Sequence, residues 1–557
     1  MGKTTERADD RSAVPSNDSD TLRTPTASRP APGQAPGQAP GQARGTLLTA
    51  DRVITLGHGR TDAHAVLIRG SRVVWVGDDP SQSPPHADHH DLAGCVIGPA
   101  FVDSHVHLTP TGITLRGLDL TGVESGRELL DAVRLYAEQH PGHVIWGHGY
   151  DPFSFPDTLP TPDELSGASA GRPVTLSRRD GHSSLVDRAT LTAAPLTRSN
   201  GVDCDASGEP TGVLRREANK IARRWIVGAM TAAELDSARA AAAARAAALG
   251  IGSVHEMGGP DSMGAEDFDA WRYGVWPVEV IPYWGGLDLH FVIERDLRQV
   301  GGDLWLDGSL GSHTAAMIDP YADAPGSTGN LEYDDDTLVD LFTEATHAGI
   351  QVAVHAIGDA AIEQAVRAWR VVDDNLPDYL EGGLRRLRHR LEHAEVIPVP
   401  LLDEIADLGL MISAQPAFEA AWGREGGMYE QRLGSERARQ TNPFRALADR
   451  GVALAFGSDS NVTPMDPWAG IHAAEQRRHP EHAMTRLEGV SASTLGGRHA
   501  ARQDRFVGPV RAGMRADLSV WEGDPYADDD PRGARCVLTL VRGRRTHGTV
   551  PLPHWVE

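Results

Sequence analysis

The sequence predicts an α/β protein built on a TIM-type (β/α)8 barrel, with a small composite β-sandwich formed by both ends of the chain. Two observations predict this fold. Eight apolar, strand-like runs alternate with helical patterns through the middle of the chain, as they do in parallel βα units. β-Rich segments with short turns lie on both sides of this middle, at residues 46–98 and 501–557.

The first 45 residues predict a disordered tail. They are rich in Pro, Gly, Ser and Thr and contain the repeat APGQAPGQAPGQA. Such a segment has too little apolar surface to offset the entropy lost on ordering. We expect residues 46–98, with runs such as HAVLIRGSRVVWVGDD, to form the first part of the sandwich, and residues 501–557 to form the second.

A barrel spanning residues 99–500 accounts for the rest of the chain. Its eight strands are expected near 100–107, 251–255, 278–283, 302–307, 351–356, 387–393, 410–415 and 453–458. Two more strand-like runs, near 143–148 and 172–177, would bring the number of strands to ten. A barrel of this type has eight, so we place both runs in an insertion at about 110–230. One helix has clear limits, because Thr231 and Glu234 form a capping box and Gly250 can end it.

Composition narrows the partners of the protein. The 557 residues carry a net charge of -24, which repels nucleic acid. The sequence has no run of 18 apolar residues, which argues against a membrane partner. Its three cysteines form no CxxC pair, and the polar first residues predict no secretory signal, so we expect a cytoplasmic protein. A small-molecule substrate is the expected partner, with a homodimer left open.

Histidines and an aspartate end several of the expected strands. His105 and His107 alternate along one strand and therefore face the same way, although two histidines alone could be ordinary polar residues. His355, His393 and Asp459 each end a later strand. Because the carboxyl ends of barrel strands converge on one face, these side chains form a ligand set for zinc, or for manganese or iron.

At these residues the chain resembles the amidohydrolase superfamily, and within it the amidohydrolase-3, YtcJ-like group that includes N-substituted formamide deformylases. The matching segments include GPAFVDSHVHL, WLDGSLGSHTAAMIDPYAD, VAVHAIGDAA, RLEHAEVI and FGSDSNVTPMDPWAGI. The resemblance implies a barrel with a composite sandwich, a bound metal and hydrolysis of amide-like bonds. It matches His105 and His107 to ligands of the first strand, His355 and His393 to those of strands five and six, and Asp459 to an aspartate that is both ligand and general base.

The sequence departs from this resemblance on strand four. Many relatives carry there a lysine that becomes carboxylated and bridges two metal ions, whereas this chain has Asp303. Its two lysines, Lys3 and Lys220, lie elsewhere, so a carbamate bridge on this strand is impossible. We favour one ion over two ions bridged by Asp303, and a solvated Asp303 without a metal role is the third alternative. Asp307, on the same strand face, is expected to orient a ligand histidine.

The expected chemistry is the attack of activated water on a carbonyl. A divalent ion lowers the pKa of bound water from ~16 towards ~7, and Asp459 can take the proton and pass it to the leaving nitrogen. His182 and His313 are candidates to stabilise the negative oxygen, with a loop histidine bonded to backbone as the alternative for His182. Gln415 and Trp146 are candidates for substrate contact, with backbone bonding or packing as alternatives.

The resemblance, together with these residues, implies metal-dependent hydrolysis of a C–N bond, in an amide, formamide or imide-like compound that is small, neutral and partly hydrophobic. A deaminase or a metal-assisted isomerase on the same scaffold is one alternative, because fold does not determine function. A binding protein that has lost catalysis is another.

Overall fold

A computed structural model describes residues 45–552, except 58–59, 151–154, 156–157, 179–182, 197–200, 261 and 381. Residues 1–44 of the expected tail lie outside this range, and so does His182, one of the expected site residues. Among the described helices, none has both the length and the apolar character needed to cross a membrane.

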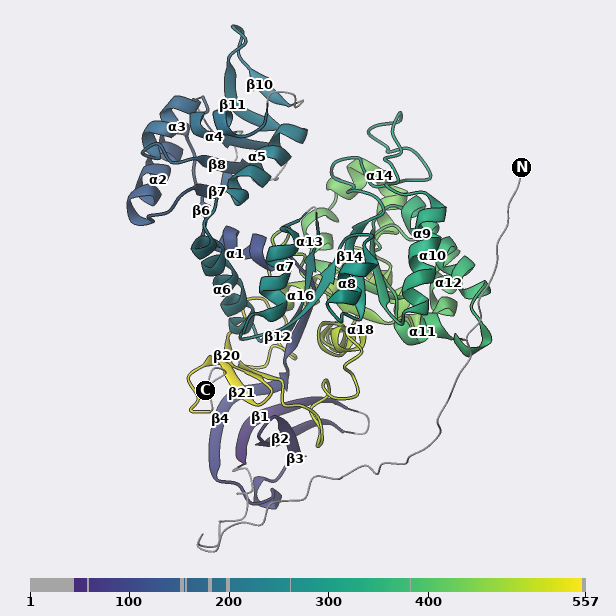
Figure 1. The fold of residues 1–557 in the computed structure, drawn as a ribbon. Helices are drawn as coiled ribbons and strands as arrows, with labels where there is room; N and C mark the ends of the chain where they lie inside the picture. Colours follow the sequence, from purple (N-terminus) through teal and green to yellow (C-terminus); the bar gives the residue numbers. More distant parts are fainter. Residues whose placement is uncertain are drawn as a thin grey trace, which may run out of the picture. The chain divides into compact units, whose positions relative to one another are not determined.

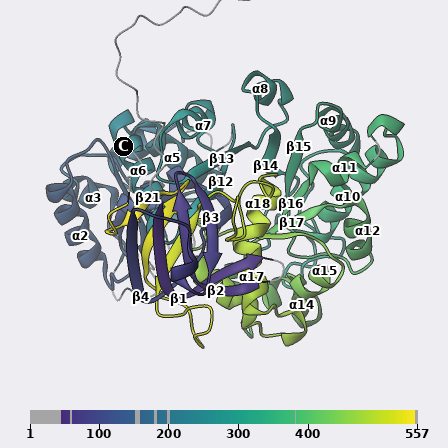
Figure 2. The same ribbon diagram turned by 90° about the horizontal axis from the view of Figure 1, so that it is seen from below.

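The two ends of the chain share one seven-stranded sheet with the order β21-β20-β19-β4-β1-β2-β3 (Figure 2). The antiparallel pair of β4 and β19 joins the ends, with Pro99 opposite Leu518 and Cys95 opposite Glu522. Apolar side chains from both ends are buried in one cluster beneath it, including Leu48, Ile97 and Val520. The strands are β1 (Thr46–Gly57), β2 (Arg60–Arg69), β3 (Arg72–Gly77), β4 (Asp88–Pro99), β19 (Leu518–Glu522), β20 (Cys536–Val541) and β21 (Arg544–Gly548).

A separate six-stranded sheet, β10-β11-β9-β8-β7-β6, is formed by residues that follow the first barrel strand. The extra strand-like runs of the sequence are β7 and β8 of this sheet, and they pair with each other. The elements are β6 (Leu118–Asp119), α2 (Gly126–Gln139), β7 (Ile145–Tyr150), α3 (Pro162–Ala168), β8 (Val174–Arg178), β9 (Ser183–Val186), α4 (Arg188–Ala193), β10 (Val202–Cys204), β11 (Pro210–Arg215) and α5 (Arg216–Gly228).

Eight parallel strands form a TIM-barrel-like domain (Figure 1). They are β5 (Phe101–Val106), β12 (Ile251–Gly258), β13 (Glu279–Trp284), β14 (Gln299–Trp305), β15 (Gln351–Ala356), β16 (Arg390–His393), β17 (Met411–Ala414) and β18 (Leu454–Phe456), each at its expected place. Their pairing runs in two sheets, β13-β12-β5 and β14-β15-β16-β17-β18, rather than in one closed ladder. Past β18, the Asp459 N–H donates to the His105 carbonyl at 2.8 Å, which ties the last strand to the first.

The helices of this domain follow the strands along the chain. They are α1 (Leu108–Arg116), α6 (Ala232–Ala248), α7 (Gly264–Tyr273), α8 (Leu289–Glu294), α9 (Asp335–His347), α10 (Asp359–Asp374), α11 (Gly383–Leu387), α12 (Leu401–Leu408), α13 (Pro416–Trp422), α14 (Met428–Arg439), α15 (Phe444–Asp449), α16 (Pro467–Glu475), α17 (Arg486–Ser491) and α18 (Gly497–Ala500). The capping box of α6 is confirmed, because Thr231 and Glu234 bond each other's backbone N–H groups. Gly250 adopts a positive φ of 72° just after this helix, as a C-terminal glycine does.

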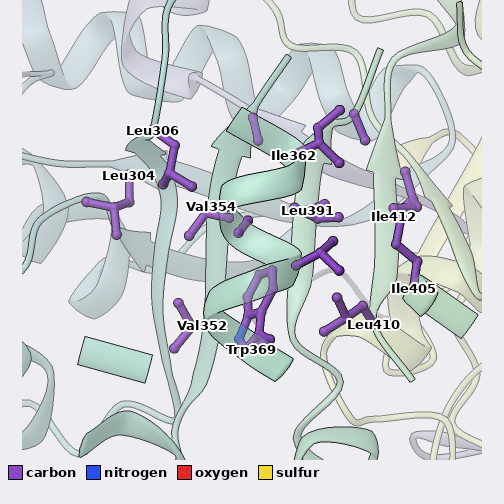
Figure 3. Packing of buried hydrophobic residues seen from close by; sticks show 14 of the residues in the cluster. Leu304, Leu306, Val352, Val354, Ile362, Trp369, Leu391, Ile405, Leu410 and Ile412 are labelled. Atoms are coloured by element: carbon purple, nitrogen blue, oxygen red, sulfur yellow. The ribbon is translucent and has the colours of Figure 1, made fainter. Parts of the chain in front are cut away.

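The largest core cluster holds the strand ends in place. Trp369 of α10 packs against the sheet near Val352 and Val354 of β15 and Leu391 of β16 (Figure 3). Fully burying an aliphatic side chain of this size contributes ~1.5–3 kcal/mol. The strands that carry the polar residues described next are therefore anchored along their length by packing, which holds their carboxyl ends in place.

Candidate metal centre

Six polar side chains meet at the carboxyl ends of five barrel strands. They are His105 of β5, His107 just after it, Asp303 of β14, His355 of β15, His393 of β16 and Asp459 after β18. On one side of the group, His107 Nε2 lies 3.0 Å from Asp303 Oδ2 and 3.3 Å from Asp459 Oδ1. His105 Nε2 lies 3.4 Å from Asp303 Oδ1. The structure thus brings together all five ligands expected from the sequence.

Asp303 lies at the middle of this group. Besides facing His105 and His107, its Oδ1 atom lies 3.6 Å from His355 Nδ1 and 3.8 Å from His393 Nε2. Its side chain is only 14% exposed. Two triads therefore share this carboxylate, one with His105 and His107 and the other with His355 and His393.

In each of the four histidines, the ring nitrogen that faces away from the group, called the outer nitrogen, forms a hydrogen bond with the surrounding protein. The other nitrogen, called the inner nitrogen, faces the group. Nδ1 of His105 donates to Glu392 Oε2 at 2.8 Å, and Nδ1 of His107 donates to the Met257 carbonyl at 3.0 Å. Nδ1 of His393 lies 2.8 Å from Gln415 Oε1, and Nε2 of His355 lies 3.2 Å from the Gly308 carbonyl. Carbonyl and carboxylate oxygens only accept, so each outer nitrogen carries a proton, and the inner nitrogen is left to offer a lone pair to a metal once any proton on it is displaced.

The inner atoms fit a divalent cation. His105 Nε2, His355 Nδ1, His393 Nε2 and Asp303 Oδ1 are buried and make no hydrogen bond with the described residues. Leaving a buried polar atom unsatisfied costs about 1–3 kcal/mol, so several of them facing one another require a common partner. Imidazole nitrogens and carboxylate oxygens at strand ends are the donors that zinc and similar ions use.

The electrostatics of the group also favour a cation. Burial opposes the charged form of His105, but Asp303, Glu392 and Asp459 raise its pKa to about 10. Burial likewise opposes the charge of Asp303, yet His105 and His107 hold its pKa well below the usual range. The carboxylates thus create a negative potential that protons satisfy when no metal is bound. A metal ion at the same place would displace these protons.

A buried ion pair between Glu392 and Arg390 holds the ring of His105 in place. Glu392, which accepts from His105, pairs with Arg390 at an N···O distance of 2.7 Å, and neither side chain is exposed. Arg390 also donates to Tyr283 Oη and to the Ser104 carbonyl, both at 2.8 Å. This pair fixes the orientation of His105. Glu392 was not predicted as a site residue, although it lies in the segment RLEHAEVI that matches the family.

Two of the expected ligands, His393 and Asp459, have a strained backbone conformation. His393 has a φ of 66° and Asp459 a φ of 51°, in the left-handed region that residues other than glycine rarely adopt. The positive φ turns His393 toward the centre even though its neighbour Glu392 also points inward. Strain of this kind persists only where the surrounding structure holds it, and it is concentrated at functional sites.

Three other expected site residues have different partners. Asp307 accepts the backbone N–H groups of Ala316, Ile357 and Gly358 at 2.8–3.0 Å, whereas its carboxylate lies 3.8 Å from His355 Nε2. It therefore fixes the loop after His355 rather than bonding the ring directly. His313 pairs with Asp323 at 2.9 Å in a loop, and it belongs to none of the possible metal-binding groups among the described residues. Gln415 bonds His393.

Trp146 lines a cavity of about 330 Å³. The cavity is also lined by Pro110, which is three residues past His107, and by Asn461, which is two past Asp459. Ile113, Val227 and Met263 make much of its wall apolar, and Arg223 lies over the Trp146 ring with its guanidinium carbon 5.4 Å from the centroid. The position of Trp146 is compatible with the expected contact to substrate.

Two aromatic side chains that were not predicted as site residues lie beside histidines of this group. The ring of Trp305, two residues past Asp303, is 50% exposed and lies 6.1 Å from the His355 ring. Phe418 of α13 lies parallel to the His393 ring at 6.1 Å. The only signal for Trp305 was its alternation with Asp303 along one strand, which places both on the same face.

Comparisons with known proteins agree with this geometry. The model of the Amidohydrolase family matches residues 89–547. The putative amidohydrolase YtcJ of Bacillus subtilis is 30% identical over 487 residues, which cover 80% of this chain and 87% of that protein. The N-substituted formamide deformylase of Arthrobacter pascens is 24% identical over 548 residues, covering 90% and 98%. An uncharacterized metal-dependent hydrolase from Pyrococcus furiosus superposes with a TM-score of 0.72 and 27% identity, over 86% of this chain and 100% of the other.

Proposed function

The chain belongs to the amidohydrolase family, and on that premise we propose that it hydrolyses a C–N bond in an amide, formamide or imide-like compound with the help of a divalent metal. The observation that carries the proposal is the set of four histidines, each bonded through its outer nitrogen and presenting the inner one to Asp303 or Asp459. A binding protein that had lost catalysis would have no need of a strained, buried Asp459 at this place.

His105, His107, Asp459 and Asp303 would hold the first ion, with zinc as the expected metal. A divalent ion bound there supplies a Lewis acid for the carbonyl and lowers the pKa of water. Neutral imidazoles suit this role because they leave most of the positive charge on the ion. The outer bonds to Glu392 and to the Met257 carbonyl keep His105 and His107 in the tautomers that this role requires.

Asp459 would act as the general base and then as the general acid. Its carboxylate faces His107 at 3.3 Å and is almost fully buried, and neighbouring histidines lower its pKa against the effect of burial. It is therefore ionised and ready to accept a proton from water. Passing the same proton to the leaving nitrogen completes the cleavage, so that one amine and one acid are released for each water consumed.

A second ion is favoured by the second triad. Asp303, His355 and His393 offer three donors within ligand reach of one another, and Asp303 belongs to both triads. An aspartate with one oxygen toward His107 and the other toward His355 is placed to bridge, which the family's lysine does in many relatives. The sequence alone favours one ion, and the metal content per chain decides between the two.

The cavity lined by Trp146 supports a small, partly hydrophobic substrate. Its volume of about 330 Å³ is at the lower end of the range for ligand pockets. Trp146, Ile113 and Met263 would contact an apolar substituent, while Trp305 and Phe418 flank the histidines of the second triad.

We extend the proposal to the fold, with the eight strands closing a barrel over residues 99–500 and the two chain ends forming a composite sandwich.

A screen of N-formyl and N-acyl amines, with metal measured on the same sample, tests the proposal. Hydrolysis that disappears on chelation and returns with zinc, manganese or iron is the expected result. Release of ammonia from an amino-substituted ring without cleavage of any amide would point instead to a deaminase. Metal binding without turnover of any compound would favour the binding protein.

A further inference from the structure

A second cavity lies at the end of the barrel strands opposite the metal centre. Its volume is about 810 Å³, and it is framed by residues that precede strands β16, β17 and β18. Arg388 comes before β16, whose last residue is the ligand His393, and Met411 begins β17, which Gln415 follows. The length of the strands therefore separates this cavity, which we call the basal cavity, from the proposed active site.

The lining of the basal cavity is strongly basic. It includes the five arginines Arg385, Arg386, Arg388, Arg502 and Arg505. Its one carboxylate, Asp504, is already bonded through both oxygens to Arg388, at 3.0 and 3.1 Å. The chain as a whole carries a net charge of -24, so a concentration of positive charge is contrary to its general composition.

Three of these arginines, Arg385, Arg502 and Arg505, form no ion pair with a carboxylate of the described residues. Arg385 donates to the carbonyls of Ala406 and Asp407, and Arg502 donates to the carbonyl of Arg298. Such bonds hold the guanidinium groups in place but leave their charge unneutralised. Arg505 is exposed and makes neither a hydrogen bond nor an ion pair with any described residue. Burial lowers the pKa of Arg502, and the positive field of Arg388 adds to the effect.

We propose that the basal cavity binds a small anion carrying at least two phosphate groups. Guanidinium groups match phosphate oxygens in pairs of parallel hydrogen bonds, and several fixed guanidinium groups around one space favour a multiply charged ligand over a single phosphate. The volume suits a molecule the size of a nucleotide. Phe506, 61% exposed at the same cavity, adds a ring surface beside Arg505. This inference does not depend on the proposed function.

Isothermal titration with tripolyphosphate and with ATP, on the metal-loaded full chain, tests the proposal. Wild-type protein should bind both anions, and Arg505→Gln should bind them about tenfold more weakly, because one charge-assisted contact is lost. Asp504→Asn should bind more tightly, because Arg388 is then released from its carboxylate. Arg127→Gln, which removes an exposed arginine of α2 outside the cavity, is the matched control and should bind as wild type does.

The three variants distinguish the basal cavity from other sources of affinity. If the anion bound at the metal centre or removed its metal, wild type and the three variants would give the same titration. That result would contradict the proposal. Binding weaker than about 1 mM for both anions would also contradict it. Equal affinity for the two anions would assign recognition to charge alone, whereas tighter ATP binding, lost in Phe506→Ala, would assign part of it to the ring.

Discussion

Replacing Glu392 by glutamine should both unfold the protein more easily and weaken its hold on metal. Among the described residues, Glu392 is the one carboxylate bonded to Arg390, whose other partners are neutral groups such as Tyr283 Oη and Ser413 Oγ. Both charges are fully buried. The variant keeps the shape and some hydrogen bonding of the side chain but leaves a buried guanidinium without an opposite charge.

The magnitude follows from the geometry of the pair. At an N···O distance of 2.7 Å and an effective dielectric constant of about 20, the Coulomb attraction is ~6 kcal/mol. The variant does not lose all of this energy, because folding no longer has to remove a charged carboxylate from water. Measured losses for one partner of a buried pair are about 3–5 kcal/mol, and we expect a loss in free energy of unfolding within that range. Loss of the carboxylate on His105 Nδ1 should weaken metal binding by about 10–100-fold.

Urea unfolding of the metal-free protein and competition for metal with a chelator measure the two effects separately. Glu404→Gln is the matched control, because Glu404 pairs with Arg370 at 2.9 Å but both side chains are about one-third exposed. That change should cost less than about 1 kcal/mol. A loss below 1 kcal/mol for Glu392→Gln, together with unchanged metal affinity, would refute the role given to this pair.

Four further changes follow from the site and its supports. Asp459→Asn should lower kcat by at least about 10²-fold, because the base is lost, while most of the metal stays bound. Asp303→Ala should halve the metal content measured by mass spectrometry if Asp303 bridges two ions, and should leave it near one ion per chain if it does not. Metal binding at pH 7 should release protons, detected by calorimetry in buffers of different ionisation enthalpy, because the pKa of His105 in the metal-free centre is raised to about 10. The stability advantage of wild type over Glu279→Gln should be full above about pH 5 and shrink below it, because burial opposes ionisation of Glu279 but Arg498 and Arg515 hold its pKa well below the unfolded value.

Each of these expectations has a result that contradicts it. Turnover retained in Asp459→Asn would remove Asp459 as the base. Complete loss of metal in Asp303→Ala would show that both triads depend on this residue and would contradict either assignment. Metal uptake without proton release would mean that the ligand histidines are already neutral. A constant difference between wild type and Glu279→Gln from pH 7 to low pH would show that the charge of Glu279 contributes nothing to stability.

The eight strands and the meeting of the five expected ligands could be predicted from sequence because their signals are local. A short apolar run that ends in histidine or aspartate, as at His355 and Asp459, predicts a strand. It also predicts that the polar residue lies on the face of the barrel where the carboxyl ends of the strands meet. The alternation of His105 and His107 correctly placed both on one side. The pairing of the chain ends was indicated by their common composition and is seen in the β4–β19 pair.

The supporting contacts could not be predicted because they depend on backbone angles and on distant residues. Alternation places Glu392 and His393 on opposite faces of β16, so choosing His393 as a ligand excluded Glu392 from the interior. The structure has both inside, because His393 adopts a positive φ. Gln415 was a candidate for contact with substrate or backbone, and its bond to His393 was not predicted. The central position of Asp303 required the placement of β14 against three other strands, which sequence spacing does not give.

The most direct test of the metal-dependent hydrolase is a single experiment on one preparation. The protein is stripped with a chelator, reloaded with zinc, manganese or iron, and measured for metal per chain and for hydrolysis of N-formyl and N-acyl amines. We expect at least one ion per chain, with hydrolysis that is absent from the stripped protein and returns in proportion to bound metal. Protein that binds no ion at His105, His107 and Asp303, and cleaves no compound under any loading, would contradict the account.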